Sequence, residues 1–103
     1  MGMLSSRLVG SPDEPAHFCP GCQQMHVLPW KRGDWTFDGD FELPTFTPSF
    51  LHTWTEGPER APRRCHYVLT AGVLNFCADS THALAGQPVP LPDLPPDLTW
   101  VSE

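Results

Sequence analysis

The chain has 103 residues, a length that suits one domain rather than two. Hydrophobic residues make up 40% and charged residues 17%, which is typical of a globular protein and excludes a disordered one. The formal net charge of -6 argues against general binding to nucleic-acid phosphates, and no stretch is apolar enough to cross a membrane. Because the N-terminus has no export signal, we expect a cytoplasmic protein with reduced thiols.

Residues 1–16 are predicted to form a flexible N-terminal arm, because "GSPDEP" interrupts any regular structure there. Residues 17–103 are then predicted to form a single zinc-binding domain. The expected fold class is mainly β, a small α+β domain stabilised by zinc. A domain this small buries a modest core, so a metal site would contribute much of its stability.

The stretch "HFCPGCQQMH" contains a C-x2-C pair, Cys19 and Cys22. Such a loop turns tightly enough for both thiolates to reach one zinc ion. A thioredoxin-like redox pair has the same spacing but requires a long helix after it, and Pro29 leaves no room for one. The flanking His17 and His26 are predicted to be surface histidines.

The next informative stretch, "ELPTFTPSFLHTW", carries Pro44 and Pro48 among apolar residues. Proline excludes a central strand, so we expect an edge strand or a rigid extended loop. The hydroxyls of Thr45, Thr47 and Ser49 are predicted to form local turn bonds. We find neither a Gly-x-Ser-x-Gly elbow nor an assembled Ser-His-Asp signature.

The clearest predicted element is a β-hairpin over residues 65–78 with its turn at Ala71-Gly72. In this register one face of the hairpin is apolar and includes Cys65, while the opposite face carries His66 and Cys77. A short helix is expected over residues 80–85, begun by Asp79 as its N-cap. A proline-rich strap is expected to follow, crossing the core through Val89, Leu91, Leu94 and Trp100.

Two cysteines do not complete a tetrahedral zinc site, so two further ligands must come from elsewhere. The residues leave two sets open. One set is Cys19, Cys22, Cys65 and His82, and the other is Cys19, Cys22, His66 and Cys77.

His66 and Asp79 are the candidate catalytic residues. The hairpin brings "CH" at 65–66 close to "DSTH" at 79–82, so a histidine and a carboxylate meet near the metal. Such a pair can serve as general acid and base or support a hydrolytic metal centre. The simpler interpretation is that Asp79 caps the helix and His82 binds a structural zinc ion.

Together these motifs resemble an uncharacterised family of small bacterial and phage proteins, over about residues 17–94. The shared motifs are C-x2-C, P-T-x-x-P-S, C-H and D-x-x-H-x-L-x-G followed by V-x-L-P. Members are similar to a component encoded beside ubiquitin-like conjugation and peptidase genes in bacterial operons. The resemblance implies metal binding and brings no established reaction. Cys77 lies outside the family motifs, which favours the ligand set with Cys65 and His82. The matching positions are Cys19, Cys22, His26, Trp35, Pro44, Thr45, Pro48, Ser49, Cys65, His66, Gly72, Phe76, Asp79, His82 and Gly86.

The leading hypothesis is a non-catalytic zinc-binding accessory module that binds a protein partner. The alternative is a small metal-dependent hydrolase of peptidase or isopeptidase type that uses His66 and Asp79 beside the metal. A thiol redox protein is the weakest of the three hypotheses.

Overall fold

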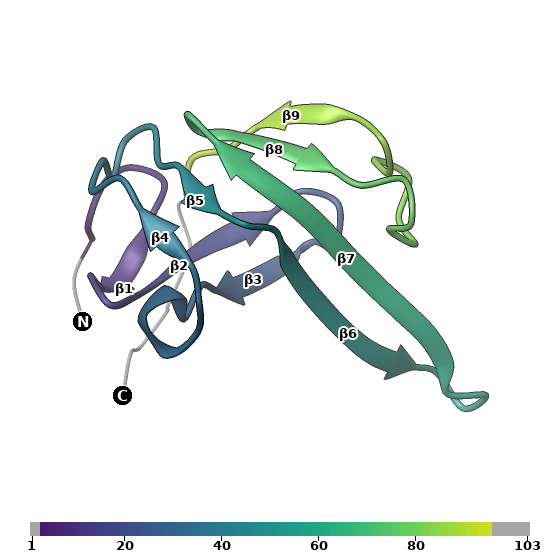
Figure 1. The fold of residues 1–103 in the computed structure, drawn as a ribbon. Helices are drawn as coiled ribbons and strands as arrows, with labels where there is room; N and C mark the ends of the chain where they lie inside the picture. The colour runs from purple at the N-terminus through teal and green to yellow at the C-terminus, as the bar shows by residue number, and fades with distance from the viewer. Residues whose placement is uncertain (1–2, 96–103) are drawn as a thin grey trace.

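The computed structural model describes residues 3–95. Its strands are arranged in three antiparallel sheets (Figure 1). The first sheet consists of β1 (Val9–Ser11), β2 (Glu14–Cys19) and β3 (Gln24–Val27). The second consists of β4 (Thr36–Phe37) and β5 (Phe46–Thr47). The third has the order β6 (Phe50–Glu56), β7 (Ala61–Thr70), β8 (Val73–Phe76) and β9 (Pro88–Pro90). Within residues 3–95, the 3-10 turn η1 (Trp30–Arg32) is the one helical element. The mainly β prediction is therefore confirmed.

The predicted hairpin is present as β7 and β8, in the predicted register. Thr70 pairs with Val73, and Tyr67 pairs with Phe76. Ala71 and Gly72 form the two-residue turn, both with positive φ, as the tight turns of two-residue hairpins require. The apolar face predicted for the hairpin is buried, and we call it the inner face of the third sheet. The opposite face, which carries His66, is the outer face.

The core lies between the inner face of the third sheet and the first two sheets. Tyr67, Phe46 and Phe50 are its largest fully buried side chains. Each buried apolar side chain of this size contributes about 1.5–3 kcal/mol relative to exposure. The core cluster consists of Leu8, Cys19, Leu28, Phe46, Phe50, Cys65, Tyr67, Leu69, Leu74, Phe76 and Leu91.

The N-terminal segment differs from the flexible arm expected over residues 1–16. Residues 9–11 form β1, which pairs with β2, and Leu8 and Val9 are buried. The physical reason is that "RLVG" supplies apolar side chains that cover the core, and the breaker "GSPDEP" forms the β1–β2 turn rather than a boundary. The boundary of a zinc-binding domain at residue 17 stays a prediction.

The helix predicted over residues 80–85 is wrong: this segment forms a bend followed by a turn. The Ser80 hydroxyl bonds both the amide and the carbonyl of His66, and the Thr81 amide donates to the Arg64 carbonyl. Ser and Thr side chains compete with helical hydrogen bonds in this way. The segment is therefore fastened to β7 instead of coiling on itself.

The proline-rich strap is present in the part of the chain that the structure describes. Its β9 pairs with β8 as an edge strand, where proline costs no ladder hydrogen bond. Leu91 is buried, and the Leu94 amide donates to the Ser6 carbonyl. Trp100 lies outside the described residues. Over the described range, no helix combines the length and hydropathy that a membrane span requires.

His17 and His26 are buried, so the prediction that they are surface histidines is wrong. They face each other across β2 and β3, on the side that packs against Tyr67. The Tyr67 hydroxyl lies 2.7 Å from His17 Nε2 and 3.1 Å from Nε2 of His52, a β6 residue. Burial lowers the pKa of His17 and that of His52 to about 4, so both rings are neutral at pH 7.

We expect the free energy of unfolding to fall as the pH is lowered from about 6.5 to about 4. Both histidines have pKa values of about 4 when folded and an ordinary value of 6.5 when unfolded. The unfolded chain therefore binds more protons throughout this window, and acid favours unfolding. His52→Gln removes one of the two titrating groups. The slope of the free energy of unfolding against pH should therefore drop by up to about 1.4 kcal/mol per pH unit. Urea unfolding of both proteins across this range measures the slopes. Equal slopes would contradict the prediction.

Candidate functional site

Two neighbouring residues of β7 point to opposite faces of the third sheet. Cys65 is fully buried on the inner face, whereas His66 is half-buried on the outer face. This follows from the two-residue period of a strand, which sends successive side chains to opposite sides. Each of the two residues is part of a separate cluster of reactive side chains.

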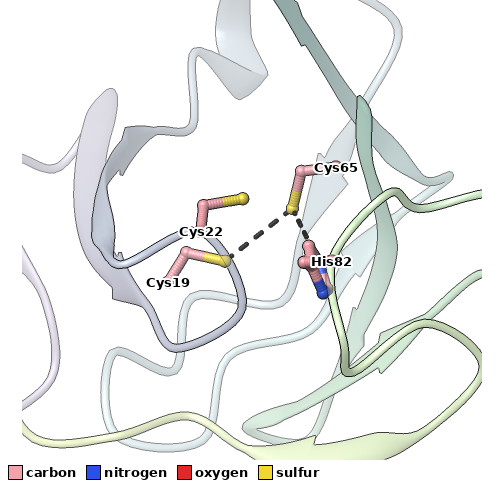
Figure 2. Close-up of side chains that lie close together, drawn as sticks. All are labelled: Cys19, Cys22, Cys65 and His82. Atoms are coloured by element: carbon pink, nitrogen blue, oxygen red, sulfur yellow. Dashed lines mark hydrogen bonds between the residues drawn. The ribbon is translucent and has the colours of Figure 1, made fainter. Parts of the chain in front are cut away.

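The inner cluster brings together Cys19, Cys22, Cys65 and His82, whose ligand atoms all lie within 4.8 Å of one another (Figure 2). Cys19 ends β2, and Cys22 lies in the following turn, closed by a 2.8 Å bond from the Gln23 amide to the Cys19 carbonyl. Cys65 comes from β7 and His82 from the turn segment after β8. This is the first of the two predicted ligand sets, and it could hold a metal ion.

Two distances between ligand atoms of this cluster are close to those of a tetrahedral zinc site. Cys19 Sγ lies 3.7 Å from Cys65 Sγ, and Cys65 Sγ lies 3.6 Å from His82 Nε2. Zinc bonds of about 2.3 Å to sulfur and about 2.0 Å to nitrogen imply edges of about 3.8 and 3.6 Å in a tetrahedron. Four protein ligands close such a site, which is characteristic of structural rather than catalytic zinc.

The thiols of this cluster cannot all ionise without a cation. The hydrogen bond from Cys65 lowers the pKa of Cys19, while burial raises the pKa of Cys22 to about 12. Cys65 donates its thiol proton in a hydrogen bond to Cys19, and this bond raises the pKa of Cys65 far above its ordinary value. One thiolate is thus stable beside two thiols, and a bound cation is what would stabilise all three as thiolates.

Gly21 in the C-P-G-C turn allows the cluster to close. A Cβ atom at this position would lie only 2.4–2.6 Å from three atoms of the His82 ring. Any other residue would therefore push the imidazole away. The Leu84 amide donates to His82 Nδ1 at 3.2 Å, which places the proton of the neutral ring on Nε2. For Nε2 to bind a cation, this proton would have to move to Nδ1, and the hydrogen bond from Leu84 would be lost.

The outer cluster is a hydrogen-bonded chain of Ser49, His66 and Asp79. Ser49 Oγ lies 2.9 Å from His66 Nε2, and His66 Nδ1 lies 3.0 Å from Asp79 Oδ1. The structure thus brings the two predicted catalytic residues together and adds a serine on the other ring nitrogen. With Asp79 accepting the Nδ1 proton, Nε2 is left to accept the proton of Ser49. This is the arrangement of a serine nucleophile, a base and an orienting carboxylate.

The expectation that Ser49 forms a local turn bond is wrong. The fold assembles a Ser-His-Asp arrangement that was not visible as a signature in the sequence. Ser49 stands two residues before Leu51, which pairs with His66 in the β6–β7 ladder. The two-residue period therefore places Ser49 on the same outer face as His66. The sequence predicted an extended segment around Ser49. It did not predict that β6 pairs with β7, and without that pairing Ser49 could not be placed beside His66.

Asp79 orients His66 instead of capping a helix. The hydrogen bond from His66 lowers the pKa of the Asp79 carboxyl, and Arg64 lowers it further. The Arg64 guanidinium donates to Asp79 Oδ2 at 3.2 Å. The carboxylate is therefore ionised at neutral pH, as an orienting group must be.

Two hollows flank the outer cluster. One of about 330 Å³ adjoins Ser49 and is lined by Gly33, Asp34, Trp35 and Pro48. The other, of about 460 Å³, is lined by Asp79 and by residues of β6 and β7 that include Trp54 and Arg64. A chain that crossed Ser49 would find space on both sides of the nucleophile.

The second predicted ligand set is not assembled. His66 and Cys77 lie on the outer face, across the sheet from Cys19 and Cys22 on the inner face. His66, Cys77 and Asp79 instead form their own group, with ligand atoms within 4.8 Å of one another. The Cys77 amide donates to the His66 carbonyl at 2.8 Å, which continues the hairpin ladder by one residue.

A family model described as "Bacterial ubiquitination-like system serine protease (BubE)" matches residues 4–77. The chain belongs to the BubE family. The resemblance inferred from the motifs, to a family near bacterial ubiquitin-like conjugation genes, is therefore confirmed. No curated protein and no solved structure matches the chain. The BubE match includes Ser49, His66 and the three cysteines of the inner cluster, whereas Asp79 and His82 follow it.

In this BubE-family chain, Cys65→Ser should abolish tight metal binding at the inner cluster and destabilise the fold. A metal present at 1,000 times its dissociation constant contributes about 4 kcal/mol to the free energy of unfolding, and the variant loses that contribution. Elemental analysis of the purified protein and urea unfolding with and without a chelator measure both effects. Thr70→Ser is the matched control, because it changes a residue of the same strand that offers no metal ligand. Wild-type unfolding that does not respond to the chelator would contradict the prediction.

Proposed function

We propose that the chain is a serine peptidase of a bacterial ubiquitin-like conjugation system, with Ser49 as the nucleophile. The observation that carries the proposal is the hydrogen-bonded chain from Ser49 through His66 to Asp79. The description of the BubE family as a serine protease of a bacterial ubiquitination-like system supports the same reaction class. The substrate class is a peptide or isopeptide bond, and the partner is a protein of the same system.

In the proposed reaction, Ser49 Oγ attacks the carbonyl carbon while His66 Nε2 accepts the hydroxyl proton. Asp79 holds the His66 ring through Nδ1 and stabilises the imidazolium that forms. His66 then donates this proton to the leaving amine, and an acyl-enzyme remains on Ser49. Water, deprotonated by His66, releases the acyl group and regenerates the serine.

The inner cluster supports this function from the opposite face of the sheet. We propose that Cys19, Cys22, Cys65 and His82 hold zinc as a structural ion, because four protein ligands leave no position for water. A non-catalytic accessory module accounts for this cluster but gives no role to the Ser49–His66–Asp79 chain. Reduced thiols at the cluster suit the cytoplasm, which we propose as the location.

One specific observation favours a metal-dependent hydrolase as the second candidate. The group of His66, Cys77 and Asp79 offers three ligands, and three protein ligands with an open position are typical of catalytic zinc. The Ser49 hydroxyl at His66 Nε2 has no role in that mechanism, so the serine peptidase is favoured. The thiol redox hypothesis is weakened because β3 follows Cys22 where a redox pair requires a helix.

Ser49→Ala should abolish covalent labelling by a fluorophosphonate and slow peptide cleavage by roughly 10³-fold or more, because the nucleophile is lost. Intact-mass analysis detects the label, and cleavage of a C-terminal extension from the ubiquitin-like protein of the same system measures activity. Thr47→Val is the matched control, since its exposed hydroxyl lies two residues before Ser49, at the end of β5, and bonds Thr36. Equal cleavage by wild type and Ser49→Ala would contradict the proposed function.

The metal-dependent alternative predicts a different response to metal removal. A brief treatment with a chelator that leaves the inner-cluster metal bound should not slow fluorophosphonate labelling, because the serine mechanism uses no metal. Elemental analysis after treatment shows which metal is retained, and the labelling rate is measured on the same sample. Loss of activity on this treatment with recovery on adding zinc would favour the metal-dependent hydrolase.

A further inference from the structure

Cys77 is a reactive side chain to which the serine mechanism gives no role. It lies directly after β8, half-buried on the outer face beside His66 and Asp79. Its backbone is fixed by the bond of its amide to the His66 carbonyl. The Cys77 sulfur, an imidazole nitrogen and a carboxylate oxygen, all within 4.8 Å of one another, are three ligands that zinc prefers.

We propose that His66, Cys77 and Asp79 form an inhibitory site for a soft divalent cation such as zinc, and that this cation blocks the peptidase. The proposal rests on the proposed function, because inhibition requires a peptidase that uses His66. It assigns Cys77 a role separate from the inner cluster, which lies on the other face of the sheet.

The blocking mechanism follows from the two ring nitrogens of His66. Nδ1 is 3.0 Å from Asp79, whereas Nε2 faces Ser49. A cation shared by Cys77 and Asp79 binds His66 through Nδ1, the nitrogen on their side. The proton of the neutral ring then resides on Nε2, and Nε2 can no longer accept the Ser49 proton. The Cys77 thiol loses its own proton to solvent as the zinc–sulfur bond forms.

The number of ligands and their exposure make this site weaker than the inner cluster. It has three ligands rather than four, and the Asp79 side chain is 44% exposed. Arg64, which donates to the same carboxylate, competes with the cation. Binding is therefore reversible at metal concentrations that leave the inner cluster loaded. Magnesium, which prefers oxygen ligands in an octahedral arrangement, suits this site poorly.

The test uses the full chain with its inner cluster loaded and follows the labelling of Ser49 by a fluorophosphonate. Added zinc should slow labelling of the wild type at least about tenfold, and magnesium should not. In Cys77→Ser, the same slowing of labelling should require at least about tenfold more zinc. Mutating residues that only support metal ligands already lowers metal affinity by that factor, and Cys77 is proposed as a ligand itself. Each protein is compared with itself with and without zinc. Thr70→Ser, on the same outer face but without a metal ligand, is the matched control and should respond as the wild type does.

Cadmium binding gives a readout that does not depend on activity. Wild type should bind one more equivalent of cadmium than Cys77→Ser when both have the inner cluster loaded, as counted by native mass spectrometry. Zinc inhibition that is equal in wild type and Cys77→Ser, or zinc that accelerates labelling, would overturn the proposal. If Ser49 is never labelled, the peptidase proposal fails, while the cadmium count still decides whether the metal site exists.

Discussion

The alternation of Cys65 and His66 on β7 is the constraint on which both clusters depend. A strand sends consecutive side chains to opposite faces, so this dipeptide places a thiol in the core and a half-buried imidazole on the outer face. The hairpin register determines which of the two residues faces the core, because a slip by one residue would exchange the two faces. The pairing of Thr70 with Val73 across the Ala71-Gly72 turn sets that register.

The segment after β8 completes both clusters from the edge of the same sheet. Ser80 bonds the His66 backbone through two hydrogen bonds, and Thr81 bonds Arg64. These bonds hold Asp79 at the outer face and allow His82 to reach the inner face, although the two residues are three positions apart. A regular helix in this segment would place Asp79 and His82, which are three residues apart, on one helical face. The two side chains could then not reach opposite faces of the sheet, and neither cluster would form as observed.

The sequence was sufficient to predict the hairpin and its apolar face, because local spacing determines both of them. Local spacing left two ligand sets open, and the family resemblance favoured the one with Cys65 and His82. The sequence was also sufficient to predict that His66 and Asp79 meet, since both flank the same hairpin. Ser49 was missed because its contact with His66 depends on β6 pairing with β7 across an intervening loop. The helix was predicted wrongly because Ser80 and Thr81 bond β7, a tertiary contact that outweighs local propensity.

The outer cluster is exposed enough that its own hydrogen bonds cannot fix its geometry. Exposed ion pairs such as Arg64 with Asp79 contribute little to stability, because solvent screens them. Nucleophilic catalysis nevertheless requires the serine and the base to be held in a defined orientation. That orientation must come from the scaffold behind the cluster, where His66 and Asp79 are joined through β7 and the turn segment to Cys65 and His82. A metal bound by those ligands would join β2, β7 and the turn segment at one point. In a chain of 103 residues with a modest core, such a cross-link is the strongest available support for an exposed triad.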